Sequence, residues 1–288
     1  MAFEIFGVQP TDDGTIFSTQ SAGGRASKKS ARGVIARHSG PGGRSEILGE
    51  AGERIQGIAV RDDRTLYAVT AKGRLLHNEA GDLKAKNLKL PDLLRVLALA
   101  DGELVVVGDH GTVARGSVQH GFTAKMFAEG QSASCVHGVS ASASGTLVAV
   151  GAPGVLINEG AEWFVARKAE ARTLLIGVHV LADDDVIIAG EPAILLRGDP
   201  RAEMRPIEVP EGVKKLKAVC EFQGSVYVAA GSDGILRLDG DRLISVNTSV
   251  AAYHLGSSKA LLCAAGMGFM ACFDGKSWTA THEDTPIT

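Results

Sequence analysis

Few residues in this sequence have the type and spacing that chemistry requires. Asp109 and His110 are adjacent and could form half of an acid–base pair, but no serine or cysteine nucleophile stands at a fixed spacing from them. His137, His179 and His254 fall on or beside the same strand of a repeated unit, where histidines could bind a metal or hydrogen-bond water. Motifs for phosphate loops, dinucleotides and zinc hydrolases are absent. We predict no catalytic residues, no metal and no cofactor.

The cysteines are spaced unlike a metal site or a redox motif. They are Cys135, Cys220, Cys263 and Cys272, they contain no Cys-x-x-Cys pair, and each lies among apolar or small residues. This setting favours buried thiols that pack as small hydrophobic groups. The sequence also begins without a basic segment followed by a long apolar run. These features predict a cytoplasmic protein.

A basic segment near the N-terminus is the first candidate for a binding surface. Residues 21–33 contain Arg25, Lys28, Lys29 and Arg32, three serines and no acidic residue. Such a segment could meet an acidic protein surface or a phosphate, although an insertion at a loop tip is also tolerated without any function. The whole chain has 30 basic and 33 acidic residues, and this balance argues against a general nucleic-acid or membrane-surface binder.

These residues are positioned by a repeat that runs along the chain. A fourteen-residue window recurs seven times at a mean spacing of about 41 residues, a period typical of repeat architectures. In most windows two short apolar runs flank a turn pair such as Asp-Gly, which indicates a β-hairpin. A second hairpin, opened by glycine-containing turns, follows each window. The windows begin at Gly7, Gly57, Arg95, Gly138, Gly177, Ala218 and Tyr253.

Four short strands in every forty or so residues are typical of a β-propeller blade. We therefore predict an all-β fold, a seven-bladed β-propeller with four antiparallel strands per blade, in which residues 1–288 form a single domain. The 36 glycines fit this fold, because hairpin turns and crowded strands near the ring axis favour small residues. Arg95 and Tyr253 break the small first column of the window, and His254 breaks its aliphatic second column. We expect the ring to close by packing of the first and last blades, with Met1–Phe6 extending the first strand.

The third strand of several blades follows a recognisable pattern. The run Val-Val-Val-Gly-Asp-His-Gly-Thr-Val-Ala-Arg at 105–115, echoed at 148–157 and 229–238, is similar to the glycine-rich core of bacterial propellers of the photosystem II assembly-factor type. In blade shape the chain also resembles WD-repeat and Asp-box propellers, and residues 273–278 resemble a shortened Asp-box. The resemblance implies a propeller over essentially the whole chain.

Turn residues give the remaining site candidates. In a propeller, the turns between second and third strands lie on one face around the channel mouth, where a rigid scaffold commonly presents binding groups. In this chain those turns carry Lys72, Asp109, His110, Glu191, Asp233 and Met267. They differ from blade to blade, as an asymmetric binding face requires.

These observations favour a non-catalytic protein-interaction scaffold or assembly factor. It would act as a monomer and bind a partner with an acidic surface, with the 21–33 segment as a contact. One alternative is a carbohydrate- or small-ligand-binding propeller, although 2 Trp and 3 Tyr supply few rings for stacking on sugars. A second alternative is a hydrolase or lyase with a site at the channel mouth.

Overall fold

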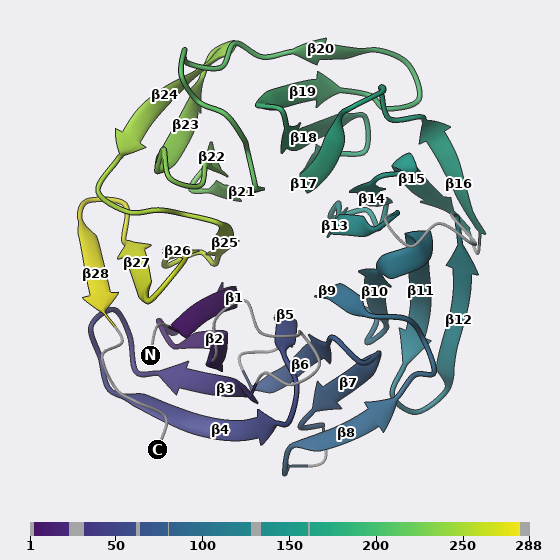
Figure 1. Cartoon of the computed structure of the whole chain (residues 1–288), viewed down its shortest axis with the longest axis vertical. Coiled ribbons are helices and arrows are strands. Elements are labelled where there is room, and N and C mark those ends of the chain that lie inside the picture. The colour runs from purple at the N-terminus through teal and green to yellow at the C-terminus, as the bar shows by residue number, and fades with distance from the viewer. Residues whose placement is uncertain are drawn as a thin grey trace.

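The structure, a computed structural model, describes residues 3–22, 32–61, 64–79, 81–127, 134–160 and 162–282. Within these residues the strands form seven antiparallel sheets of four, arranged as a ring around a central channel (Figure 1). In each sheet the first strand lies at the channel and the fourth at the rim (Figure 1). The predicted all-β, seven-bladed propeller is confirmed. None of the helical structure in the described ranges has the length and apolar character needed to cross a bilayer.

Every blade is built from four strands that are consecutive in the chain. Blades 1 to 3 comprise β1 (Phe3–Pro10), β2 (Ile16–Ala22), β3 (Arg32–His38), β4 (Ser45–Ala51); β5 (Ile55–Arg61), β6 (Thr65–Thr70), β7 (Arg74–His77), β8 (Lys84–Asn87); and β9 (Leu93–Ala98), β10 (Leu104–Gly108), β11 (Thr112–Ser117), β12 (Gly121–Met126), with a 3-10 turn η1 (Asp109–Gly111). Blades 4 and 5 comprise β13 (Val136–Ala141), β14 (Leu147–Gly151), β15 (Gly154–Glu159), β16 (Glu162–Arg167); and β17 (Leu174–Ala182), β18 (Asp185–Glu191), β19 (Ile194–Gly198), β20 (Met204–Pro206). Blades 6 and 7 comprise β21 (Ala218–Phe222), β22 (Ser225–Ala229), β23 (Ile235–Asp239), β24 (Arg242–Asn247); and β25 (His254–Ser257), β26 (Leu262–Ala265), β27 (Phe269–Phe273), β28 (Trp278–His282).

The hydrophobic core lies between neighbouring blades. Second strands such as β10 and β14 are buried along their whole length, because each face of a blade packs against an adjacent blade. One cluster, for example, joins Val148 and Ile157 of blade 4 to Val178 and Ile188 of blade 5. Continuous aliphatic runs in these strands are therefore explained by burial on both faces.

Small residues in the innermost strands let adjacent blades approach closely. A Cβ atom added at Gly57 would lie 2.8 Å from the Cα of Arg95 and 2.9 Å from the carbonyl oxygen of Leu94, both in the next blade. Ordinary contacts are longer, so a side chain at this position would push the two inner strands apart. The first-column glycines are thus required by the neighbouring blade.

The ring closes by packing of the first blade against the last. β1 pairs with β2 and packs beside β25, while β28 forms the outer edge of its own sheet. The Ile5 N–H donates to the Gly266 carbonyl at 3.2 Å, and the Gln9 side chain donates to the Ser257 carbonyl at 3.2 Å. The expected closure is confirmed from Phe3 onward, and Met1 and Ala2 lie outside the described residues.

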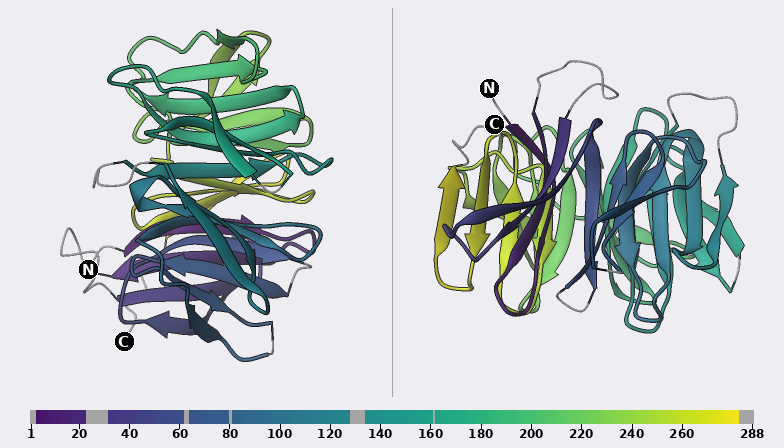
Figure 2. Two further views of the ribbon diagram at one scale, coloured as in Figure 1. Left: turned by 90° about the vertical axis from the view of Figure 1, so that its right-hand side faces the viewer. Right: turned by 90° about the horizontal axis from the view of Figure 1, so that it is seen from below.

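Strand direction divides the turns between two faces. Because strands alternate in direction, turns between second and third strands share one face with the links between blades; we call this the link face. The remaining turns lie on the opposite face, which we call the hairpin face. Figure 2 shows the ring from its side, with the turns gathered at these two edges.

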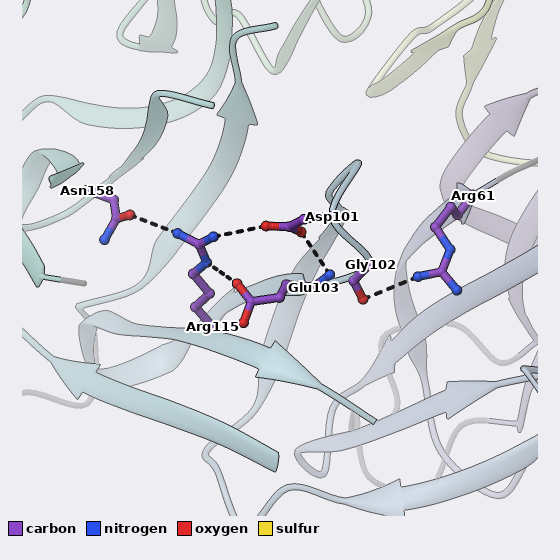
Figure 3. Close-up of polar contacts among 6 residues, drawn as sticks. All are labelled: Arg61, Asp101, Gly102, Glu103, Arg115 and Asn158. Carbon is purple, nitrogen blue, oxygen red and sulfur yellow. Dashed lines mark hydrogen bonds and ion pairs between the residues drawn. The ribbon is translucent and has the colours of Figure 1, made fainter. Parts of the chain in front are cut away.

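On the hairpin face, the arginine of the glycine-rich pattern links blades 3 and 4, and a second arginine links blades 2 and 3 (Figure 3). Arg115 donates to Glu103 at 2.6 Å and to Asp101 at 3.2 Å within blade 3, and to Asn158 of blade 4 at 3.3 Å. Arg61 of blade 2 donates to the Gly102 carbonyl at 3.2 Å. The pattern that carries the family resemblance therefore has a structural use in joining blades.

Candidate functional site

The basic segment is shorter than the sequence suggested. β2 runs to Ala22 and β3 starts at Arg32, and Ala22 pairs with Arg32 in the ladder. Arg32 is therefore a strand residue, not a loop residue, and its Nε donates to the Glu50 carboxylate of β4 at 2.9 Å. The boundaries at 21 and 33 are corrected because the ladder continues past both predicted ends. Arg25, Lys28 and Lys29 lie outside the described residues.

Three predicted turn residues lie on the link face in different settings. Lys72 is exposed in the turn between β6 and β7. Glu191 follows β18's aliphatic run and accepts a hydrogen bond from the Lys217 ammonium at 2.8 Å, which lowers the pKa of the Glu191 carboxyl. Asp233 accepts a long bond of 3.5 Å from the Lys214 N–H. Of these three residues, only Glu191 forms an ion pair within the described part of the chain.

Asp109 and His110 both lie in the η1 turn, but the structure does not join them as an acid–base pair. The Asp109 carboxylate accepts a hydrogen bond from the Cys135 thiol at 2.9 Å. His110 has a left-handed backbone with φ of 57°, which the tight turn imposes. No hydrogen bond between the two side chains occurs in the described part of the chain.

The cysteine prediction is wrong for two residues. Cys263 and Cys272 stand opposite each other on β26 and β27, with Cα atoms 4.2 Å apart, and form a disulfide. Spacing along the chain concealed this pair because a hairpin brings the two residues together. Cys135 and Cys220 lie outside this disulfide, and burial raises the pKa of the Cys220 thiol to about 12.

The central channel contains a cavity of about 370 Å³ lined by all seven innermost strands. Its aliphatic wall includes Leu97, Val139, Ile176 and Leu255. Its polar side chains include those of Ser140 and Ser257 and the larger groups of Gln9, Arg95, His137, His179, Lys217 and His254. The cavity therefore has aliphatic sides and a set of predominantly basic groups.

Two of these polar groups meet across the channel. Arg95 of β9 and His254 of β25 come from blades 3 and 7, and the Arg95 guanidinium lies 3.1 Å from the His254 Nδ1 atom. A guanidinium only donates, so Nδ1 must accept and the imidazole proton is on Nε2. A second nitrogen of Arg95 donates to the Leu94 carbonyl at 2.8 Å.

Burial sets the charge state of both groups. Burial lowers the pKa of Arg95 to about 10, so the guanidinium remains charged at neutral pH. Burial, followed by the nearby charges of Arg95 and Lys217, lowers the pKa of His254 well below its ordinary value. The pair is thus one fixed positive charge beside a neutral imidazole.

The link-face mouth of the channel is bordered by cations on aromatic rings. The Arg54 guanidinium lies 4.5 Å from the centre of the Phe6 ring, and the Phe6 ring lies 6.4 Å from that of His254. The Lys215 ammonium lies 5.7 Å from the centre of the Tyr253 ring. Such contacts orient a cation without neutralising it.

The hairpin-face mouth also brings opposite charges together. Glu221 lies 3.8 Å from the His179 ring, and Asp12 pairs with Lys259 at 3.2 Å across the junction of blades 1 and 7. Burial lowers the pKa of His179, and Glu221 partly opposes that shift. Carboxylates are thus close to the basic groups at this mouth.

Arg95 was not predicted as a site residue, and His254 was considered only as a metal ligand or a partner of water, yet the sequence carried a signal for both. Both interrupt columns of the repeat that are otherwise small or aliphatic. Spacing could not show their contact, because the two residues are 159 positions apart and meet only when the ring closes. Within the described residues, no group of three His, Cys, Asp or Glu side chains is placed to hold a metal ion.

No protein-family model and no curated protein matches this sequence. Among solved structures, the chain is similar to virginiamycin B lyase from Staphylococcus aureus, with 10% identity, a TM-score of 0.72 and 90% of each chain covered. A catalytically inactive histidine-to-alanine variant of that lyase with quinupristin gives 12% identity, a TM-score of 0.76 and 92% of each chain. YCF48 bound to D1 peptide gives 14% identity and a TM-score of 0.65, over 91% of this chain and 88% of that one. At these identities the likeness is one of fold, a seven-bladed β-propeller.

Proposed function

We propose that this protein is a non-catalytic interaction scaffold that binds an acidic segment of a protein partner on its link face. The observation that carries the proposal is a group of cations around the channel mouth. Arg54, Lys72 and Lys215 form no ion pair with a carboxylate in the described residues. Unpaired cations at one mouth create a positive potential that attracts acidic partners.

An exposed apolar side chain on the same face supports the same proposal. Met267, in the turn between β26 and β27, is 62% exposed, and methionine is common on surfaces that bind proteins. The likeness in fold to YCF48, whose structure contains a peptide of D1, is consistent with a protein partner. The basic residues Arg25, Lys28 and Lys29 would add to the same charge. We infer that the scaffold acts as a monomer.

The alternative functions have less support. Sugar binding usually needs open aromatic faces, but Tyr67 and Trp163 are buried, and Trp278 stacks on Phe273 with ring centres 5.0 Å apart. A hydrolase or lyase that uses Asp109 and His110 would need the two groups to cooperate, and Asp109 instead accepts from Cys135.

Charge reversal on the link face tests the proposal. Partners recovered by affinity purification with the wild-type chain should be lost with the double variant Lys72→Glu and Lys215→Glu, because two attractive charges become repulsive. The control reverses two exposed lysines elsewhere, Lys84→Glu and Lys276→Glu, and should recover the same partners as wild type. A third variant replaces residues 23–31 by a short Gly-Ser linker and tests the basic segment separately.

Quantitative comparison of recovered proteins decides the outcome. We expect the amount of partner recovered with the link-face variant to be at least fivefold lower than with wild type, which is the order of effect that removing one or two attractive charges causes. Recovery should fall further as the salt concentration rises. The proposal would be contradicted if the link-face and control double variants lost partners equally, or if the link-face variant recovered as much partner as wild type.

A further inference from the structure

We propose that the channel is a binding site for a small aliphatic monocarboxylate, held between Arg95 and His254. The inference concerns the cavity inside the ring and does not rest on the proposed function of the link face. Its basis is the guanidinium of Arg95, which lies in the cavity wall without a carboxylate partner among the described residues.

Arg95 has donors available for a ligand. A guanidinium carries five N–H donors in a planar fork that matches the two oxygens of a carboxylate. One contact goes to the Leu94 carbonyl and one to the His254 Nδ1 atom, at 2.8 and 3.1 Å. These contacts hold the side chain across the channel and leave donors of the fork unused.

His254 supplies a further donor in the same wall. Because its Nδ1 accepts from Arg95, its Nε2 carries a hydrogen and can donate. The Phe6 ring lies near the imidazole, with ring centres 6.4 Å apart. A cation fork and a neutral N–H donor are therefore present together, as recognition of a carboxylate requires.

The net charge of the wall favours a monoanion. Arg95 contributes one positive charge, and the charge of Lys217 is opposed by Glu191 at 2.8 Å. His254 is neutral because burial lowers its pKa. One uncompensated charge matches a carboxylate better than a phosphate dianion.

The size and the aliphatic wall of the cavity define the rest of the ligand. A volume of about 370 Å³ is at the small end of the range for ligand sites, so a short molecule fits and a drug-sized one does not. Leu97, Val139, Ile176 and Leu255 would surround an alkyl group. A short-chain fatty acid such as butyrate has both features.

Calorimetric titration with butyrate tests this assignment, with butyramide and inorganic phosphate as matched probes. Wild-type protein should bind butyrate with a Kd near or below about 1 mM. Butyramide has the same shape without the charge and should bind at least tenfold more weakly, as should phosphate. Binding should be lost in Arg95→Gln and weakened at least fivefold in His254→Gln. The control Arg201→Gln, at an ion pair on the hairpin face, should bind as wild type does.

The variant Arg95→Lys separates loss of binding from loss of folding, because it keeps the positive charge and removes the guanidinium fork. We expect it to bind butyrate more weakly than wild type while retaining the wild-type circular dichroism spectrum. The proposal is overturned by any of three results in folded protein. One is no saturable butyrate binding up to about 20 mM, which corresponds to negligible affinity. The second is equal binding of butyramide or phosphate. The third is unchanged butyrate binding in Arg95→Lys and Arg95→Gln.

Discussion

At the residue scale, buried histidines are the groups whose charge depends most on the fold. His38 is 1% exposed on β3, and its Nε2 atom lies 2.9 Å from the Ser18 hydroxyl. Burial lowers the pKa of His38 to about 4, and it also lowers the pKa values of His179 and His254. A proton that binds these groups readily in the unfolded chain is therefore bound poorly in the folded one.

His38 should make the protein sensitive to acid. Because its folded pKa is below its unfolded value, its contribution to stability is present above about pH 6.5 and is lost as the pH falls toward 4. The difference of pKa corresponds to about 3 kcal/mol. The free energy of unfolding can be measured with urea at pH 7 and at pH 4. Its decrease between these two pH values should be about 3 kcal/mol smaller in His38→Gln than in wild type.

The exposed His120 provides the control for this measurement. His120→Gln should lose as much stability between the two pH values as wild type does. If His38→Gln and wild type had the same pH dependence, the neutral buried state of His38 would be disproved.

At the element scale, the hairpin is the unit that sequence patterns predict well. Alternating apolar residues and turn pairs placed all seven innermost strands, because those features act over a few residues. Both ends of the 21–33 segment were misplaced, because Ser21 pairs with Gly33 and Ala22 pairs with Arg32. No turn residue in the sequence indicates where this pairing of β2 with β3 stops. The disulfide was missed for a related reason, because the register of β26 and β27 decides which cysteines face each other.

The disulfide in the β26–β27 hairpin can be checked by alkylation. Denatured protein that has not been reduced should react with iodoacetamide at Cys135 and Cys220 alone, and reduced protein should react at all four cysteines. The variant Cys263→Ser with Cys272→Ser should lose about 2 to 3 kcal/mol under oxidising conditions, because the closed loop is short. Cys135→Ser, which leaves the disulfide intact, serves as the control.

Alkylation of all four cysteines before reduction would show that the pair is not joined. The same trapping in living cells tests the cytoplasmic location that the sequence predicts, because cytosolic thiols are kept reduced. A pair that is already joined in cells would count against that location.

At the scale of the whole molecule, stability depends on the completed ring. Among the described residues, hydrophobic clusters connect every neighbouring pair of blades, and the cluster containing Ile5, Val8 and Cys263 connects the first to the last. The repeat predicted this architecture, since each blade needs neighbours on both faces. It could not predict the Arg95–His254 contact, which forms between blades that the chain separates by 159 residues.

Gly256 is the residue that most directly tests ring closure. A Cβ atom at this position would collide with the Val8 carbonyl oxygen, which belongs to blade 1. Gly256→Ala should therefore lower the free energy of unfolding by about 1 to 3 kcal/mol or more, as overpacking does. Chemical denaturation should detect this loss as a shift of the single unfolding transition.

Gly52→Ala is the matched control, because nothing lies within 4 Å of the added Cβ atom there and its φ is not in the left-handed region. It should leave the transition nearly unchanged. Equal effects of the two substitutions would mean that the junction between blades 1 and 7 adds little to stability.

Closure without an exchanged strand also has a mechanical consequence. Blade 7 holds blade 1 through side-by-side packing and a few hydrogen bonds, such as Ile5 to Gly266, whereas successive blades are joined by the chain itself. A force applied to the two ends acts first on this junction and opens the ring by separating blade 1 from blade 7. Blades would then peel away one by one, each releasing about 140 Å of extended chain, and a single-molecule force trace would show a sawtooth with that spacing.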